Sequence, residues 1–181
     1  MKEMQNDLDL LLLGIANIIA IFQFIAAIKW PKLARFSFFL LFAWACWMNI
    51  HTSIQSPEKY LEYADLAWSR LYRQIITGWF ADHITLAVGF IAVCQGAIAV
   101  SMLLKGWIYI LGSVGAIIFL LAILPFGIGS GFPSTGIAAL SITILLKHVP
   151  TKFLWQKKFS GVLKGIHPKK TRSYESQTAI D

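Results

Sequence analysis

Residues 84–128 read ITLAVGFIAVCQGAIAVSMLLKGWIYILGSVGAIIFLLAILPFGI, and Lys105 is the only formally charged residue among them. A hydrocarbon core about 30 Å thick is crossed by roughly 20 helical residues. The apolar runs before and after Lys105 each reach that length. The stretch therefore predicts two antiparallel membrane-spanning helices joined by a tight turn at Lys105-Gly106, and this hairpin decides the fold.

The composition extends the conclusion to the rest of the 181-residue chain. It is 57% hydrophobic and 14% charged, with a mean hydropathy of +0.65. Soluble domains average about 45–50% apolar and about 25% charged residues. A soluble chain of this length has no core large enough to bury so much apolar surface, and the composition also excludes disorder for most of the chain. We therefore expect an all-α integral membrane protein.

Five apolar segments alternate with charged connections. The fifth is short and follows PFGIGSGFP (residues 125–133), in which proline and glycine disfavour helix and predict a turn. The expected fold is a five-helix transmembrane bundle within residues 1–149. The alternative is four helices plus a re-entrant fifth segment, because irregular backbone is tolerated at membrane depth where protein or water covers it. The predicted spans are 10–28, 36–54, 84–104, 107–124 and 132–147.

The distribution of lysine and arginine predicts an orientation. With five spans, one side of the membrane receives 12 of these residues and the other receives four, together with all seven acidic residues that precede the tail. Basic connections favour the cytoplasm. We therefore expect a bacterial inner (plasma) membrane protein with its N-terminus outside and its C-terminus cytoplasmic. An even number of spans, with both termini on one side, also fits the charges. The acidic N-terminus is unlike a cleavable signal, so the first span is expected to be retained.

The tail, residues 150–181, supplies most of the net charge of +7. Apolar residues recur in it near helical spacing between lysines, which predicts a basic amphipathic helix on the inner leaflet, followed by a polar, disordered end. These apolar residues are Phe153, Leu154, Trp155, Phe159, Val162, Leu163 and Ile166. Attraction to anionic lipid explains the high isoelectric point without a nucleic-acid partner. Docking of a soluble protein is the alternative role.

Few polar groups interrupt the predicted spans. No ionisable side chain lies deep within them, which argues against a pump or a proton-coupled carrier. Cys46 and Cys94 fall near the middle of spans two and three and are expected to act as small hydrophobic residues. The amides within the spans predict hydrogen bonds between helices, and Gln95 is also a candidate ligand contact. These amide residues are Asn17, Gln23, Asn49 and Gln95.

The longest connection contains SPEKYLEYADLAWSRLYRQIITGWF (residues 56–80). Its apolar residues form a stripe at helical spacing, with most charges off the stripe. Pro57 is suited to open a helix and Gly78 to close one. We therefore expect one amphipathic helix over residues 57–80 on the outer face, with Trp68, Tyr72 and Trp79 at the interface.

The candidate ligand-binding residues lie on or beside this outer segment. His51 ends span two and His83 begins span three, so two imidazoles at one depth could ligate a haem or a metal. The alternative is that both are polar ends of spans, and no HxxxH or Cys/His spacing predicts a metal site. Arg73 and Gln74 could bind an anionic or quinone-like head group. The remaining candidates are Tyr72 and Asp82.

Three stretches make the chain resemble the DoxX-like group of small bacterial membrane proteins: SPEKYLEYADLAWSRLYRQII, CQGAIAVSMLLKG and GAIIFLLAILPFGIGSGFP. The resemblance covers roughly residues 36–146. It implies a four-helix membrane bundle, with quinone-coupled sulfur oxidation or an accessory role in some members. Similar proteins often have a glutamate where this chain has Gln95. The additional N-terminal span and the basic tail also depart from that pattern.

Three functional hypotheses follow. The first is an accessory or scaffold protein of the inner membrane, such as a small subunit of a larger complex or a homo-oligomer. The second is a membrane protein that binds a lipophilic ligand, a quinone or a lipid, or is associated with redox chemistry of the DoxX-like type. The third is a small-molecule transporter. Whether the chain is an enzyme stays open at this point.

Overall fold

A computed structural model describes residues 2–155, and every regular element in that range is helical. This confirms the expected all-α fold. The predicted amphipathic helix of the tail lies mostly outside the described residues, as does the polar end of the chain. The long elements are α1 (Lys2–Lys29), α2 (Pro31–Gln55), α5 (Ile84–Leu103), α6 (Gly106–Ile123) and the shorter α7 (Ser134–Leu146).

Four segments of the described chain are long and apolar enough to cross a membrane. They correspond to the first four predicted spans. The fifth predicted span contains α7, which has only 13 helical residues. At 1.5 Å per residue, α7 is about 20 Å long, shorter than a hydrocarbon core. The four segments are Leu10–Lys29, Pro31–Gln55, Ile84–Leu103 and Gly106–Gly127.

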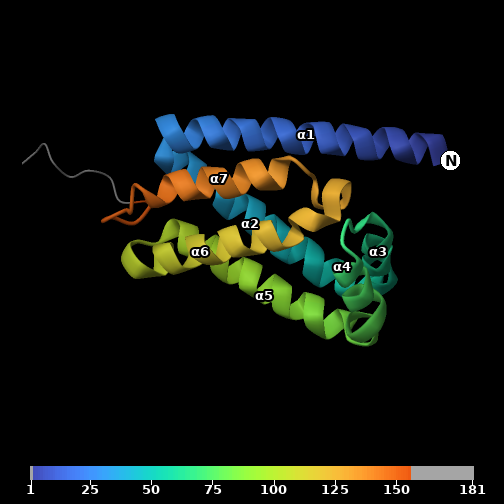
Figure 1. Ribbon diagram of the computed structural model, residues 1–181. Helices are drawn as coiled ribbons and strands as arrows, with labels where there is room; N and C mark the ends of the chain where they lie inside the picture. Colours follow the sequence, from blue (N-terminus) through green and yellow to red (C-terminus); the bar gives the residue numbers. More distant parts are fainter. Residues whose placement is uncertain (1, 156–181) are drawn as a thin grey trace, which may run out of the picture.

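The helices run between two ends of opposite charge (Figure 1). One end, at the left of Figure 1, holds the α1–α2 turn, the α5–α6 turn and the segment after α7. We call it the basic end because it carries six lysines and arginines and, within residues 2–155, no acidic residue. The acidic end holds the start of α1 and the segments 56–83 and 124–133. The six basic residues are Lys29, Lys32, Arg35, Lys105, Lys147 and Lys152.

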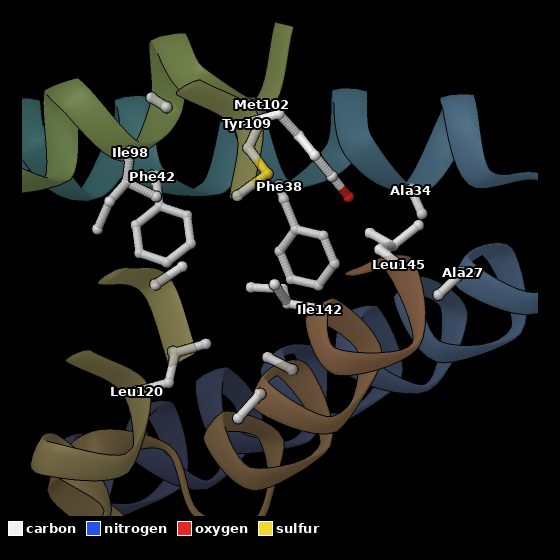
Figure 2. Packing of buried hydrophobic residues seen from close by; sticks show 14 of the residues in the cluster. Ala27, Ala34, Phe38, Phe42, Ile98, Met102, Tyr109, Leu120, Ile142 and Leu145 are labelled. Atoms are coloured by element: carbon white, nitrogen blue, oxygen red, sulfur yellow. The ribbon is translucent and has the colours of Figure 1, made fainter. Parts of the chain in front are cut away.

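Apolar side chains from α2, α5, α6 and α7 meet in one core. Figure 2 shows Phe38 and Phe42 pointing from α2 toward Ile142 on α7 and Leu120 on α6. Both phenylalanines are almost fully buried, as is Met102 from α5. The helix α2 packs most extensively against α5, whereas α1 packs against α7 and α2 at the edge of the bundle. The core therefore lies beside α2, and Arg35 and Ser53 are the buried polar residues of that helix.

The predicted α5–α6 hairpin is present. Leu104 and Lys105 have extended backbones, and Gly106 opens α6 with a φ of +62°. The two helices cross closely because a Cβ at Gly112 would overlap the side chain of Ser101. The small residue Gly96 instead faces α2, where a Cβ would lie 3.3 Å from Sγ of Cys46. Small residues thus bring α5 close to both neighbours.

The second span begins earlier than expected. Residues 36–54 were predicted, but α2 begins at Pro31, so Lys32 and Arg35 belong to the helix. Proline is well tolerated at the first helical position because its missing N–H needs no partner there. The sequence placed Arg35 in a connection, but the structure places it one turn inside α2, where it is only 4% exposed.

The expectation of one helix over residues 57–80 is also wrong. The segment is divided into η1 (Pro57–Glu62), α3 (Tyr63–Leu66), α4 (Arg70–Ile75) and η2 (Ile76–Phe80). Ala67 and Ser69 have extended backbones between α3 and α4. The break has a tertiary cause, since the Trp68 N–H donates to the carbonyl of Pro125 (N···O 2.9 Å) rather than to its own helix.

That bond joins segment 57–80 to the turn that follows α6, η3 (Leu124–Ser130). A Cβ at Gly127 would lie 2.6 Å from Nε1 of Trp68, so the indole lies directly against the glycine backbone. A Cβ at Gly129 would similarly meet Leu66 and Tyr63. The outer segment therefore covers an irregular, glycine-rich backbone, which is the condition for such backbone at membrane depth.

Candidate functional site

Three polar side chains form a hydrogen-bonded chain at the interface of α2 and α5. The Asn49 amide Nδ2 donates to Oε1 of Gln95 over 2.7 Å. The hydroxyl of Tyr60, on η1, donates to Oδ1 of Asn49 over 2.9 Å. These hydrogen bonds thus connect the acidic end to the side chain of Gln95, which is buried in the middle of α5. We call these three residues the polar chain.

The surroundings of the polar chain favour neutral groups. Burial raises the pKa of the Tyr60 hydroxyl above its ordinary value, and the neighbouring Tyr63 adds to the shift. Burial likewise raises the pKa of Tyr63, with a smaller contribution from the charge of Glu62. Both phenols therefore stay protonated at neutral pH, and Tyr60 remains a hydrogen-bond donor to Asn49.

A second polar cluster lies at the basic end, around Arg35. Its guanidinium Nε donates to the carbonyl of Met102 over 3.0 Å, and Nη2 donates to the carbonyl of Leu104. These carbonyls belong to the C-terminal end of α5, where backbone acceptors lack partners inside the helix. The guanidinium carbon also lies 4.8 Å from the ring centroid of Tyr109 on α6. One side chain from α2 thus joins both helices of the hairpin.

Two hydroxyls beside this cluster have no partner beyond each other within the described residues. Tyr109 and Ser113 lie one turn apart on α6 and are fully buried. The Ser113 hydroxyl lies close to that of Tyr109, and neither oxygen has another hydrogen-bond partner among residues 2–155. Because Tyr109 also contacts Arg35 of α2, the interior at the basic end contains several polar groups.

Tyr72 and Arg73 hold the outer segment in place. The Tyr72 hydroxyl donates to the carbonyl of Ala122 near the end of α6 over 2.9 Å. The Arg73 Nε donates to the carbonyl of Ala64 over 3.1 Å, which braces α4 against α3. These contacts stabilise the fold of residues 57–80. They also engage the Tyr72 hydroxyl and the Arg73 Nε, which belong to residues that the sequence predicted to bind a ligand.

The two candidate histidines are stacked on tryptophans of their own segments. His51 stacks on Trp47, with ring centroids 5.4 Å apart, and His83 stacks on Trp79 at 4.9 Å. The ring Nδ1 of His83 also lies 2.9 Å from the carbonyl of Trp79. Within residues 2–155, no group of three or more His, Cys, Asp and Glu side chains is placed to hold a metal ion.

Gln74 and Asp82 are exposed at the acidic end. A surface hollow of about 500 Å³ lies instead at the basic end, where it is lined by residues 30–33 of the α1–α2 turn. The seven predicted site residues are therefore spread over the polar chain, the contacts of the outer segment and the exposed acidic end. The structure does not gather them into one pocket.

The sequence analysis did not single out Tyr60 or Arg35. A tyrosine three residues after Pro57 gives no signal by itself, because its partner Asn49 is defined only by the packing of η1 on α2. Arg35 was assigned to a connection because charge normally ends a span. Pro31 was the available signal, since it marks a helix start that places Arg35 one turn inside α2.

Comparisons of the chain with protein-family models, with curated proteins and with solved structures found no match. The resemblance to DoxX-like proteins therefore stays a prediction.

Proposed function

We propose that this chain is an accessory or scaffold protein of the membrane, acting as a small subunit of a larger complex. The observation that carries the proposal is that polar side chains inside the bundle form hydrogen bonds between helices. Asn49 bonds to Gln95 between α2 and α5, and Gln23 bonds to Ser37 between α1 and α2 over 3.0 Å. Arg35 joins α2 to the α5–α6 hairpin.

The outer faces of the bundle supply surface for partners. The helix α1 packs on α7 and α2 with one side only, and its other side exposes large apolar residues. In a bilayer, such a face meets lipid chains or a neighbouring helix. From residue 10 onward, the large apolar residues of α1 that are more than half exposed are Leu10, Leu11, Leu12, Ile18, Ile21 and Ile28.

Purification in a mild detergent tests the proposal. Protein extracted from native membranes should carry a second membrane protein, or further copies of itself, at a fixed ratio. The extraction should be repeated with an Ile18→Ala, Ile21→Ala variant on α1 and with a matched Leu86→Ala, Phe90→Ala variant on α5. A constant ratio of partner to this protein, lowered in either variant, supports a specific complex. Co-purifying proteins that differ from one preparation to the next argue against one.

We further propose five spans in a bacterial inner membrane, with the N-terminus outside and the C-terminus in the cytoplasm. The charge difference between the two ends of the bundle supports this topology. So does α7, which runs back from the acidic end toward the basic end. Reporter fusions at the two termini should report opposite sides of the membrane, while a four-span protein would place them on the same side. A fusion at Lys105 serves as the cytoplasmic control.

The polar chain favours one alternative, the binding of a lipophilic ligand such as a quinone or a lipid. Tyr60 and Gln95 place a hydroxyl and an amide at two depths of the same interface. Extraction and analysis of lipids from the purified protein would detect such a ligand. An Asn49→Leu variant should lose it, and a Val93→Leu variant on the exposed side of α5 should retain it.

A further inference from the structure

The two ends of the bundle differ in charge even when the basic residues after residue 155 are not counted. Within residues 2–155, the basic end carries six lysines and arginines without an acidic residue, and the acidic end carries all seven aspartates and glutamates. The lysines at the basic end are solvent-exposed, so their charges are available to a partner. These exposed lysines are Lys29, Lys32, Lys105, Lys147 and Lys152.

Exposed tryptophans accompany these lysines. Trp107 is 84% exposed at the start of α6, and Trp30 and Trp155 are also exposed at this end. Tryptophan is enriched where a membrane protein meets the head-group region, because its ring is apolar and its N–H is polar. We call the five exposed lysines and these three tryptophans the basic rim.

The segment after α7 is tied into the rim. The Gly106 N–H donates to the carbonyl of Pro150 over 3.2 Å, and the Leu154 N–H donates to the carbonyl of Leu103 over 3.1 Å. The Lys105 ammonium lies 4.7 Å from the ring centroid of Phe153. These contacts hold residues 150–155 against the α5–α6 turn, which fixes Lys152 and Trp155 beside the other rim residues.

The buried Arg35 adds to the positive charge of this end. Its hydrogen bonds go to the carbonyls of Met102 and Leu104, which are neutral. The guanidinium charge is therefore not cancelled by a carboxylate there. The whole end presents a positive surface with aromatic groups at its edge.

We propose that the basic rim selectively binds the head groups of anionic phospholipids in the leaflet that it faces. Phosphate oxygens complement the lysine ammonium groups, and the tryptophan rings occupy the adjoining interface. Each basic residue near an anionic surface contributes about fivefold to the association. The rim thus positions the bundle in its leaflet through lipid contacts as well as through its apolar spans.

The test compares two variants of the full-length protein that each lose two positive charges. Lys32→Gln with Lys147→Gln removes charge from the rim, and Lys59→Gln with Arg70→Gln removes it from the acidic end. Each protein is reconstituted in nanodiscs of phosphatidylcholine and phosphatidylglycerol, and its bound lipids are counted by native mass spectrometry. All four positions are exposed, so equal unfolding temperatures are expected and confirm intact folds.

The original protein should retain phosphatidylglycerol in preference to phosphatidylcholine. The rim variant should lose this preference by about fivefold for each lysine removed, whereas the acidic-end variant should keep it. High salt should weaken the preference, because it screens exposed charges. An unchanged preference in the rim variant would overturn the proposal. So would displacement of the lipid by inorganic phosphate, which would assign the site to a soluble anion.

Discussion

The side-chain amide of Asn49 on α2 donates a hydrogen bond of 2.7 Å to the side-chain amide of Gln95 on α5. The bond crosses the most extensive helix–helix contact of the bundle, and Gln95 is only 2% exposed. A buried amide without a partner is costly in an apolar environment. The pair therefore fixes how α2 and α5 are aligned, and Tyr60 extends the alignment to the outer segment.

A double-mutant cycle tests this alignment. Asn49→Leu and Gln95→Leu should each destabilise the protein, and the double variant should be more stable than the sum of the two losses predicts. We expect a coupling free energy of about 1 kcal/mol, which is typical of hydrogen bonds between membrane helices. Unfolding in mixed detergent micelles provides the measurement. Strictly additive losses would show that the two amides act independently.

Arg35 should be the most sensitive charged residue of the spans. Arg35→Met removes two hydrogen bonds from a charged donor and its contact with the Tyr109 ring, so we expect a loss of roughly 3 kcal/mol. Arg35→Lys should restore little, because an ammonium cannot reproduce the planar guanidinium fork. Thermal unfolding measures both, with the exposed Lys32→Met as the control. Equal unfolding temperatures for the Arg35 and Lys32 variants would contradict this role.

Gly127 should tolerate no side chain. Its φ of +59° strains other residues, and a Cβ would lie 2.6 Å from the Trp68 indole. Gly127→Ala should therefore cost about 1–3 kcal/mol for the backbone alone and should expose segment 57–80 to protease. Gly14→Ala is the control, because nothing lies within 4 Å of a Cβ there and alanine favours helix. Unchanged protease resistance in the Gly127 variant would show that Trp68 does not hold the turn.

The half-buried phenols of Tyr60 and Tyr63 predict a loss of stability in alkali. The pKa values of Tyr60 and Tyr63 are raised above the ordinary 10.0, chiefly by burial. Below that pH both the folded and the unfolded chain are protonated, and the stability does not depend on these groups. As the pH rises further, the unfolded chain ionises first, so stability falls until the folded phenols also ionise.

The phenolate absorbance of the folded protein, followed during an alkaline titration, measures these pKa values. Tyr60→Phe should remove part of the late-ionising signal and flatten the fall in stability. Tyr72→Phe is a suitable control, because Tyr72 bonds to a backbone carbonyl at a different place. Ionisation of all tyrosines together near the ordinary value would contradict the burial of this pair.

The sequence predicted those helices that depend only on the length and hydropathy of their own segment. The two long charge-free runs around Lys105 correspond to α5 and α6, because length and hydropathy alone select a spanning helix. The bonding of amides between helices is confirmed for Gln23, Asn49 and Gln95. It is wrong for Asn17, whose Nδ2 donates to the carbonyl of Leu13 in its own helix.

The remaining features depend on contacts between distant segments. The period of residues 57–80 predicts a continuous helix, but the bond from Trp68 to Pro125 breaks it, and no local pattern encodes that partner. Arg35 was assigned to a connection because it is charged, and its acceptors on Met102 and Leu104, 67 and 69 residues away, could not be predicted from the local sequence. The candidate ligand residues His51 and His83 were grouped by depth alone, and the structure stacks each on its own tryptophan.

The proposed role as a subunit is tested most directly by the mass of the particle in native lipid. The protein should be extracted from its own membrane into polymer nanodiscs, without detergent, and weighed by native mass spectrometry. The chain alone has a mass of 20.3 kDa. We predict a particle that contains this mass together with a second protein, or a whole-number multiple of it. A particle that holds one copy of the chain and lipid alone would contradict the proposed role.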